Sequence, residues 1–186
     1  IVVSYLNGEI VYAAHHSGSW STATVLNGTS ATSYPRIAMN NSNHAVTAFG
    51  SFYNTTINIY KNHYNGSSWG ALTIGDYLYA TFTSDFYYPY LGLDDSGNAL
   101  YVWTDLTNIQ WCSTTYTATS CTPASLNPVS GNVSISRVAM TTAGNAYAIW
   151  QQNNGSNEAI YFASFNGSTW TTPADLTGSI SPTGTD

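Results

Sequence analysis

Charged side chains are scarce in this sequence. Lys, Arg, Asp and Glu make up only 6% of the 186 residues, against about a quarter in ordinary soluble domains. The three cations are Arg36, Lys61 and Arg137, and the formal net charge is −6. Because nucleic-acid phosphates are bound by clustered Lys and Arg, we expect no nucleic-acid partner.

Long apolar runs and helical periodicity are also missing. No run approaches the ~18 to 20 apolar residues that span a bilayer, so no transmembrane segment is predicted. No signal peptide stands before Ile1, which indicates either its removal or a start within a longer protein. Short alternating runs rich in aromatic and β-branched residues, bounded by Gly, Asn, Asp and Pro, are typical of strands. The sequence therefore predicts an all-β protein.

Cysteine occurs only twice. Cys112 and Cys121 flank "STTYTATS", whose pattern indicates the two arms and turn of a hairpin. Facing positions on two arms bring the Cβ atoms within bridging distance, so we predict a disulfide and, with it, a secreted or cell-surface location. Two thiolates alone would be an incomplete zinc shell. Potential glycosylation sequons, which are compatible with export, stand at Asn27, Asn40, Asn54, Asn65, Asn132, Asn154 and Asn166.

What the sequence does contain is an internal repeat. The phrases "IVYAAHHSGSW", "IYKNHYNGSSW" and "IYFASFNGSTW" each place an Ile ten residues before a Trp, around a Ser-Gly or Asn-Gly turn. Asn-Gly supplies the positive φ angles of a tight hairpin turn. The three tryptophans, Trp20, Trp69 and Trp170, are predicted to cover these turns with apolar surface.

A second repeated phrase precedes the first. It reads "YPRIAMNNSNHAVTAF", "YPYLGLDDSGNALYVW" and "ISRVAMTTAGNAYAIW". Together the phrases predict four short strands per unit, in the second unit at residues 36–39, 45–49, 57–64 and 69–74. Four antiparallel strands repeated every ~40 to 50 residues are typical of a β-propeller blade.

We therefore predict a single β-propeller domain with about four blades, at residues 1–33, 34–86, 87–133 and 134–186. The first blade is partial, because no inner strand of the "PRIAM" type precedes its other strands. This predicts either a longer propeller or closure between chains.

The turn phrases "YNGSSW", "FNGSTW" and "HSGSW" resemble the Asp-box, or BNR-like, repeat of sialidase-type propellers, Ser-x-Asp-x-Gly-x-Thr-Trp. The Gly and Trp are kept, and the Asp is not. The whole repeat is similar to those of uncharacterised bacterial secreted or surface propellers. The third blade departs most from the pattern, since Thr119 stands where the Trp is expected and the Cys pair replaces the box.

Two sets of residues are candidates for ligand binding. Arg36 and Arg137 begin inner strands at the same repeat position, which Tyr90 occupies in the third blade. The resemblance to sialidases, whose inner-strand arginines bind carboxylates, implies an anion site here; alternatively, the arginines bond loop carbonyls. The second set contains the aromatic residues that end the second strands, Tyr5, Phe49, Trp103 and Trp150. Such rings stack on sugars, or else they pack between blades.

No metal, cofactor or catalytic residue is predicted. The turn "DDSGN" (residues 94–98) contains carboxylates that calcium could use, but the aligned turns "NNSNH" and "TTAGN" lack them, which favours a plain hairpin turn. His15 and His16 are neighbours on a strand and point to opposite faces.

These features predict a non-catalytic, extracellular glycan-binding propeller, such as a lectin or adhesin. Two alternatives stay open. One is a structural subunit of a surface layer or fibre that self-associates through the open edge of the first blade. The other is a sialidase-like glycoside hydrolase, which would need an acid paired with a nucleophile; no such pair is assignable among the nine acids.

Overall fold

The computed structural model describes residues 2–7, 10–26, 35–53, 56–70, 77–80, 89–104, 107–126, 132–153 and 157–177. It describes the side chains of these residues except those of 2–7, 10–11, 51–53, 56–58, 77–80 and 134–135. Within this part of the chain every regular element is a β-strand. The all-β prediction is therefore confirmed.

The strands form four antiparallel sheets in chain order, and three of these sheets have the same meander topology. The second sheet contains β5 (Arg36–Met39), β6 (Ala45–Tyr53), β7 (Thr56–Tyr64) and β8 (Tyr77–Ala80). The third contains β9 (Tyr90–Leu93), β10 (Asn98–Thr104), β11 (Ile109–Thr115) and β12 (Ala124–Ser125). The fourth contains β13 (Val133–Met140), β14 (Ala146–Asn153), β15 (Glu158–Phe165) and β16 (Ala174–Asp175).

The first sheet differs from the other three. It contains β1 (Val2–Asn7), β2 (Ile10–Ser17), β3 (Ser19–Trp20) and β4 (Thr24–Val25). β1 pairs with β2, and β2 pairs with both short strands. Within the described residues β1 pairs only with β2. Its counterparts in the other sheets, β6, β10 and β14, each pair with a further, inner strand. The prediction of a first blade without its inner strand is confirmed.

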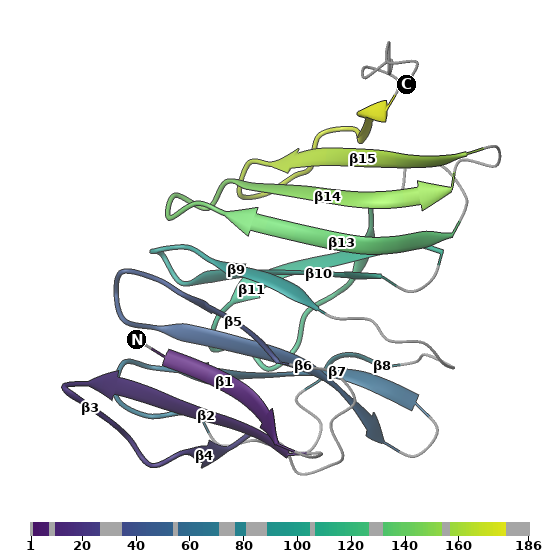
Figure 1. Cartoon of the computed structure of the whole chain (residues 1–186). Helices are drawn as coiled ribbons and strands as arrows, with labels where there is room; N and C mark the ends of the chain where they lie inside the picture. The colour runs from purple at the N-terminus through teal and green to yellow at the C-terminus, as the bar shows by residue number, and fades with distance from the viewer. Residues whose placement is uncertain are drawn as a thin grey trace, which may run out of the picture.

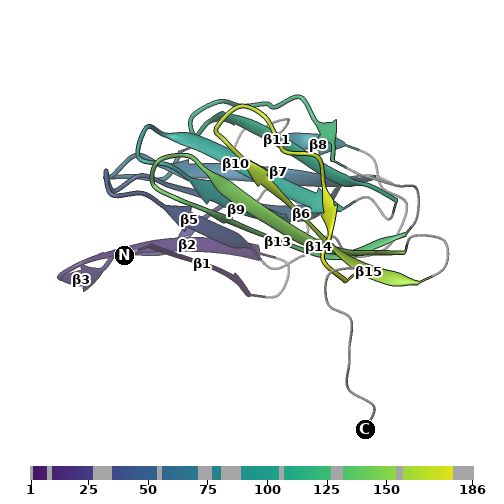
Figure 2. The ribbon, with the colours of Figure 1, turned by 90° about the horizontal axis from the view of Figure 1, so that it is seen from above.

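The sheets are stacked one on the next along the chain, from the N-terminus to the C-terminus (Figure 1). Strands β1, β5, β9 and β13 follow one another through the stack, and each contacts the next. In the view from above they lie along one side, while β8 and β11, from the outer half of their sheets, lie along the other (Figure 2). This is the arrangement of part of a β-propeller, with β1, β5, β9 and β13 on its inner side. The blade boundaries remain a prediction.

Of the predicted fourth strand of the second unit, at residues 69–74, residues 71–74 lie outside the described residues. The outer strand is β8, which pairs with residues 58–60 of β7, while Trp69 makes a single bridge to Tyr64. The fourth sheet repeats this, with a Phe165–Trp170 bridge before β16. The Trp closes the hairpin turn. The chain continues beyond this Trp before its outer strand pairs with the middle of the third strand. The turn glycines Gly66 and Gly167 both have φ of +95°, which is the role that the Asn-Gly phrase predicts.

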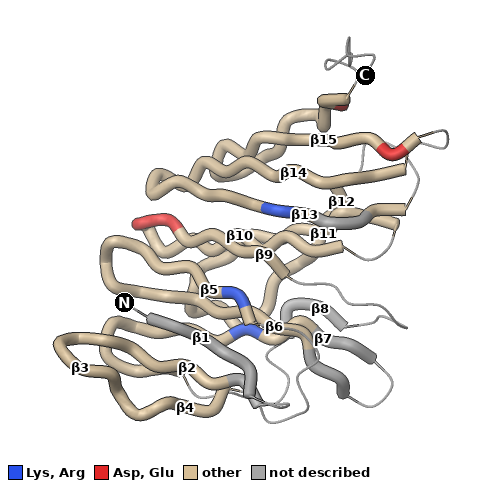
Figure 3. Tube along the Cα trace, in the orientation of Figure 1, with Lys and Arg blue, Asp and Glu red and all other residues tan. Residues whose placement is uncertain are grey.

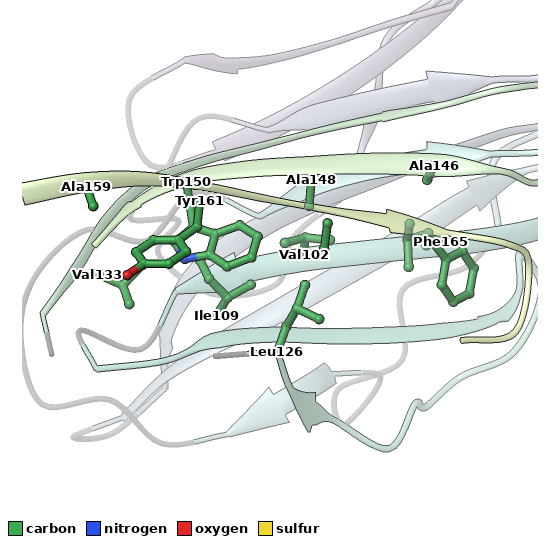
Figure 4. Packing of buried hydrophobic residues seen from close by; sticks show 12 residues of the cluster. Val102, Ile109, Leu126, Val133, Ala146, Ala148, Trp150, Ala159, Tyr161 and Phe165 are labelled. Carbon is green, nitrogen blue, oxygen red and sulfur yellow. The ribbon is translucent and has the colours of Figure 1, made fainter. Parts of the chain in front are cut away.

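The core lies between successive sheets. Side chains on each second strand point alternately to the two faces of its sheet. We call the face directed at the preceding sheet the leading face, and the face directed at the following sheet the trailing face. The trailing residues Val46 and Ala48 of the second sheet pack with the leading residues of the third, Ala99, Tyr101 and Trp103. Leu100 and Val102 pack in the same way with Ala146, Ala148 and Trp150 of the fourth sheet (Figure 4). Burial of each Leu or Val side chain of this kind stabilises the fold by about 1.5–3 kcal/mol.

Candidate functional site

The strongest candidate site is formed by the three predicted inner-strand residues, Arg36, Tyr90 and Arg137. Arg36 begins β5, Tyr90 begins β9, and Arg137 lies within β13. Each occupies the same register position, opposite Ala48, Val102 and Ile149 of the adjoining second strands. Because the three inner strands are neighbours, equivalent repeat positions come together.

Tyr90 joins the two arginines. The guanidinium carbon of Arg137 lies 4.5 Å from the centroid of the Tyr90 ring, and that of Arg36 lies 5.1 Å from it. Both distances are within the range of cation–π attraction. Arg36 Nη2 also donates a hydrogen bond to the Tyr90 hydroxyl (3.3 Å). Arg137 Nη1 donates to the carbonyl of Ser136 (2.7 Å), so the carbonyl-bonding alternative holds for part of this guanidinium.

The cluster has a positive local charge. Arg137 is exposed, and Arg36 and Tyr90 are half-buried. The acids with described side chains are Asp94, Asp95, Glu158 and Asp175, and they lie at turns and strand ends rather than beside the arginines (Figure 3). Arg36 and Arg137 lie on the two strands that flank β9, and a planar guanidinium can donate paired hydrogen bonds to a carboxylate or sulfate.

Three residues of the second predicted set are buried in the core. Phe49 and Trp103 are fully buried and Trp150 is 1% exposed. Phe49 stacks on Tyr60 and Trp150 on Tyr161, and Trp150 Nε1 donates to Gln152 Oε1 (3.0 Å). Their burial favours the packing alternative, because they point into the leading face of their sheets. The side chain of Tyr5 lies outside the described residues.

Two hollows were not anticipated from the sequence. One, of about 230 Å³, lies on the trailing side of the fourth sheet and is lined by Asn145, Tyr147, Ser164, Phe165, Asn166, Thr169, Trp170 and Thr171. The other, of about 360 Å³, lies between the hairpins of the first two sheets and is lined by His15, His16, Ser17, Asn43, Tyr64, Gly66 and Ser67. The only sequence signal for the first is Tyr147, which stands where the other sheets have Val46 and Leu100.

The turn at residues 94–98 connects β9 to β10, as the hairpin interpretation predicts. Asp94 is buried, and its carboxylate accepts hydrogen bonds from the backbone NH and the side-chain amide of Asn98 (2.7 and 2.8 Å). The Asp95 carboxylate accepts two from Asn41, and Asp95 NH donates to the Thr142 carbonyl (2.9 Å). Asp95 therefore links the turns of three sheets, through its carboxylate to the second sheet and through its backbone NH to the fourth. Within the described residues no three His, Cys, Asp or Glu side chains are grouped to hold a metal.

Among the predicted sequons, Asn40 is unsuited to carry a glycan. It is buried, and its side chain bonds the Asp94 carbonyl and the His44 NH. Asn65, Asn132 and Asn166 are exposed. The side chains of Asn27, Asn54 and Asn154 lie outside the described residues.

The predicted disulfide is confirmed. Cys112 of β11 and Cys121 are bonded, with their Cα atoms 5.9 Å apart. Both pack against the core between the second and third sheets. In the part of the chain that the structure describes, no helix could cross a membrane.

No protein-family model matches the sequence, and no curated protein matches it significantly. Solved structures do match. One is an endo-arabinase from Bacteroides thetaiotaomicron, with a TM-score of 0.53 at 10% identity over 94% of this chain and 75% of that one. A glycosyl hydrolase from Bacteroides ovatus gives 0.44 at 10% identity, over 94% of this chain and 69% of that one. A fucose lectin from Kordia zhangzhouensis, solved with methyl-fucoside, gives 0.41 at 15% identity, over 73% and 96%.

The endo-arabinase comparison supports the fold and corrects one prediction. The expectation that the chain is not an enzyme is contradicted, because its fold is similar to that of a protein named as an enzyme. The expectation rested on the lack of a recognisable acid and nucleophile pair in the sequence. At 10% identity, catalytic residues need not stand in a recognisable motif, so that ground was insufficient.

Proposed function

We propose that this protein is a glycan-active β-propeller that holds an acidic saccharide at Arg36, Tyr90 and Arg137. The observation that carries the proposal is the Tyr90 ring on β9, which contacts one guanidinium from each of the two inner strands beside it. Arginine pairs suit the planar, bidentate geometry of a carboxylate or sulfate. The fold likeness to an endo-arabinase supports a saccharide as the carrier of that group.

The same proposal includes the location and the repeat. The Cys112–Cys121 disulfide supports a secreted or surface protein, because disulfides persist in oxidising compartments. The Gly and Trp of the turn phrases support descent from an Asp-box in which the Asp has been lost.

Titration calorimetry tests the site. Oligogalacturonate and sialyllactose are compared with lactose and neutral arabino-oligosaccharides, and release of new reducing ends is measured in parallel. We expect an acidic ligand to bind. Arg137→Gln should weaken its binding by about 10- to 100-fold, since a hydrogen bond to a charged group is worth about 1.5–3 kcal/mol.

Three variants sharpen the test. Arg137→Lys keeps the charge and loses the planar fork, so it should recover only part of the affinity. Arg36→Gln should weaken binding like Arg137→Gln. Thr117→Glu, at an exposed turn of the third sheet, should bind as the wild type does. The proposal is overturned if no saccharide binds or is cleaved. It is also overturned if acidic ligands bind the double variant, Arg36→Gln with Arg137→Gln, with unchanged affinity.

A further inference from the structure

The fourth sheet has a trailing face that no described residue covers. On the second and third sheets the trailing residues Val46, Ala48, Leu100 and Val102 are fully buried. Their counterparts on the fourth sheet are Tyr147 and Ile149, which are 59% and 43% exposed. Phe162, opposite Ile149 on β15, is half-buried and extends this apolar surface.

The hollow beside Tyr147 has a counterpart that is filled. In the second sheet, the ring of Tyr116 from the third sheet stacks on His44 (4.6 Å) and meets His63 edge-on (5.7 Å). In the fourth sheet the equivalent positions are Asn145 and Ser164, and both line the hollow. The hollow therefore corresponds to the place that an aromatic ring of a following sheet occupies.

The opposite end of the stack shows the complementary feature. Trp69 packs against the cluster that joins the first and second sheets, and Trp170 lies 6.0 Å from Trp111 of the preceding sheet. Trp170 thus contacts the sheet before its own, and Trp69 packs on the cluster that the first two sheets share. Trp20 holds the same place in the first sheet and is 53% exposed.

We propose that the trailing face of the fourth sheet docks onto the leading face of the first sheet of a second copy of this chain. Within the chain, the trailing face of each sheet packs on the leading face of the next. The occupant is a second copy because its first sheet offers a leading face of the same kind. Phe162 pairs with Ile149, and Trp111 pairs with Val102, which holds the same position in the third sheet. Phe162 is therefore the counterpart of Trp111. Trp20 of the copy therefore lies against Phe162, as Trp170 lies against Trp111.

The contact is heterologous, so it joins copies head to tail. Tyr147, Ile149, Phe162 and Trp20 are uncharged, so what these side chains contribute to the contact is apolar burial.

Sedimentation velocity and light scattering of the full chain over a range of concentrations test the proposal. We expect the wild type to associate with rising concentration. Ile149→Glu disables the trailing face and Trp20→Glu the leading face, so each variant alone should stay a monomer. Mixed in equal amounts, they should form a dimer and nothing larger, because each retains the face that the other lacks. Thr117→Glu should associate as the wild type does.

Far-UV circular dichroism checks that each variant is folded, and Tyr147→Glu replaces Ile149→Glu if the latter fails to fold. A wild type that remains a monomer at every concentration overturns the proposal, as does a mixture that does not form dimers. A monomer that binds a neutral saccharide, and loses it on Tyr147→Ala, also overturns it and makes this face a ligand site.

Discussion

At the scale of single residues, the buried hydroxyl of Tyr101 is the clearest test of the core. Tyr101 is fully buried between the second and third sheets, and no described residue bonds its hydroxyl. Tyr101→Phe keeps the ring and removes an unsatisfied polar group, so the free energy of unfolding in urea should stay level or rise by about 1–2 kcal/mol. Thr47→Val is the contrast, because the Thr47 hydroxyl donates to the Arg36 carbonyl (2.8 Å) and its loss should destabilise. A clear loss of stability in Tyr101→Phe would contradict the assignment.

The same residue gives a pH dependence with a definite sign. Burial raises the pKa of the Tyr101 hydroxyl above its ordinary value of 10.0, because the charged phenolate is poorly solvated there. Above about pH 10 the unfolded chain therefore releases a proton that the folded chain keeps, and stability falls as pH rises. Urea unfolding between pH 8 and about 11 should show a steeper fall for the wild type than for Tyr101→Phe. Equal slopes would count against a buried neutral hydroxyl.

Sequence reasoning located residues on strands better than it placed them on faces. Arg36, Tyr90 and Arg137 share a repeat position, and equivalent positions on adjacent inner strands must be neighbours. Phe49, Trp103 and Trp150 also share a position, at the end of the second strand, but their side chains point into the leading face. Which face is buried depends on the neighbouring sheet, and no local pattern contains that information.

At the scale of elements, Gly92 permits the close approach of β9 to β13. A Cβ atom at this position would lie 2.3 Å from Cβ of Met140, although β5 has Ala38 at the aligned position. Gly92→Ala should therefore destabilise the protein by about 1–3 kcal/mol, as overpacking of a core does. Thermal and urea unfolding measure the change. Combining it with Met140→Gly, which removes that Cβ atom, should recover part of the loss in a double-mutant cycle, and a purely additive double variant would contradict the contact.

The disulfide stabilises the hairpin that lacks a turn Trp. Cys112 and Cys121 are nine residues apart, so the closed loop is short and the stabilisation should be below the ~3 kcal/mol estimated for a 15-residue loop. After reduction, hydrogen exchange should rise mainly between residues 109 and 126, with the second sheet as the internal reference. The unreduced protein should be lighter by two hydrogens than the reduced one. Free thiols in protein purified without reductant would contradict both this role and the extracellular location.

At the scale of the whole molecule, the repeat predicted four sheets and their order, because a fixed period places equivalent strands at equivalent depths. It gave no ground for the non-catalytic prediction, which is contradicted, since function depends on loops that the repeat does not constrain. It also did not locate β8, the described outer strand of the second unit, for a related reason. Its position follows from pairing along β7 rather than from the conspicuous Trp69.

Salt should separate the two proposed contacts, because they depend on different forces. Binding of an acidic saccharide by Arg36 and Arg137 is electrostatic at a partly exposed site, and the screening length falls from about 10 Å at 0.1 M salt to about 3 Å at 1 M. Its affinity should therefore drop as sodium chloride is raised. Head-to-tail association buries uncharged apolar side chains, so the same salt should leave it level, and sulfate should strengthen it. Calorimetry and sedimentation on one preparation measure both. Association that weakens with salt in parallel with saccharide binding would show that charged groups carry the contact, against the assignment to Tyr147, Ile149 and Phe162.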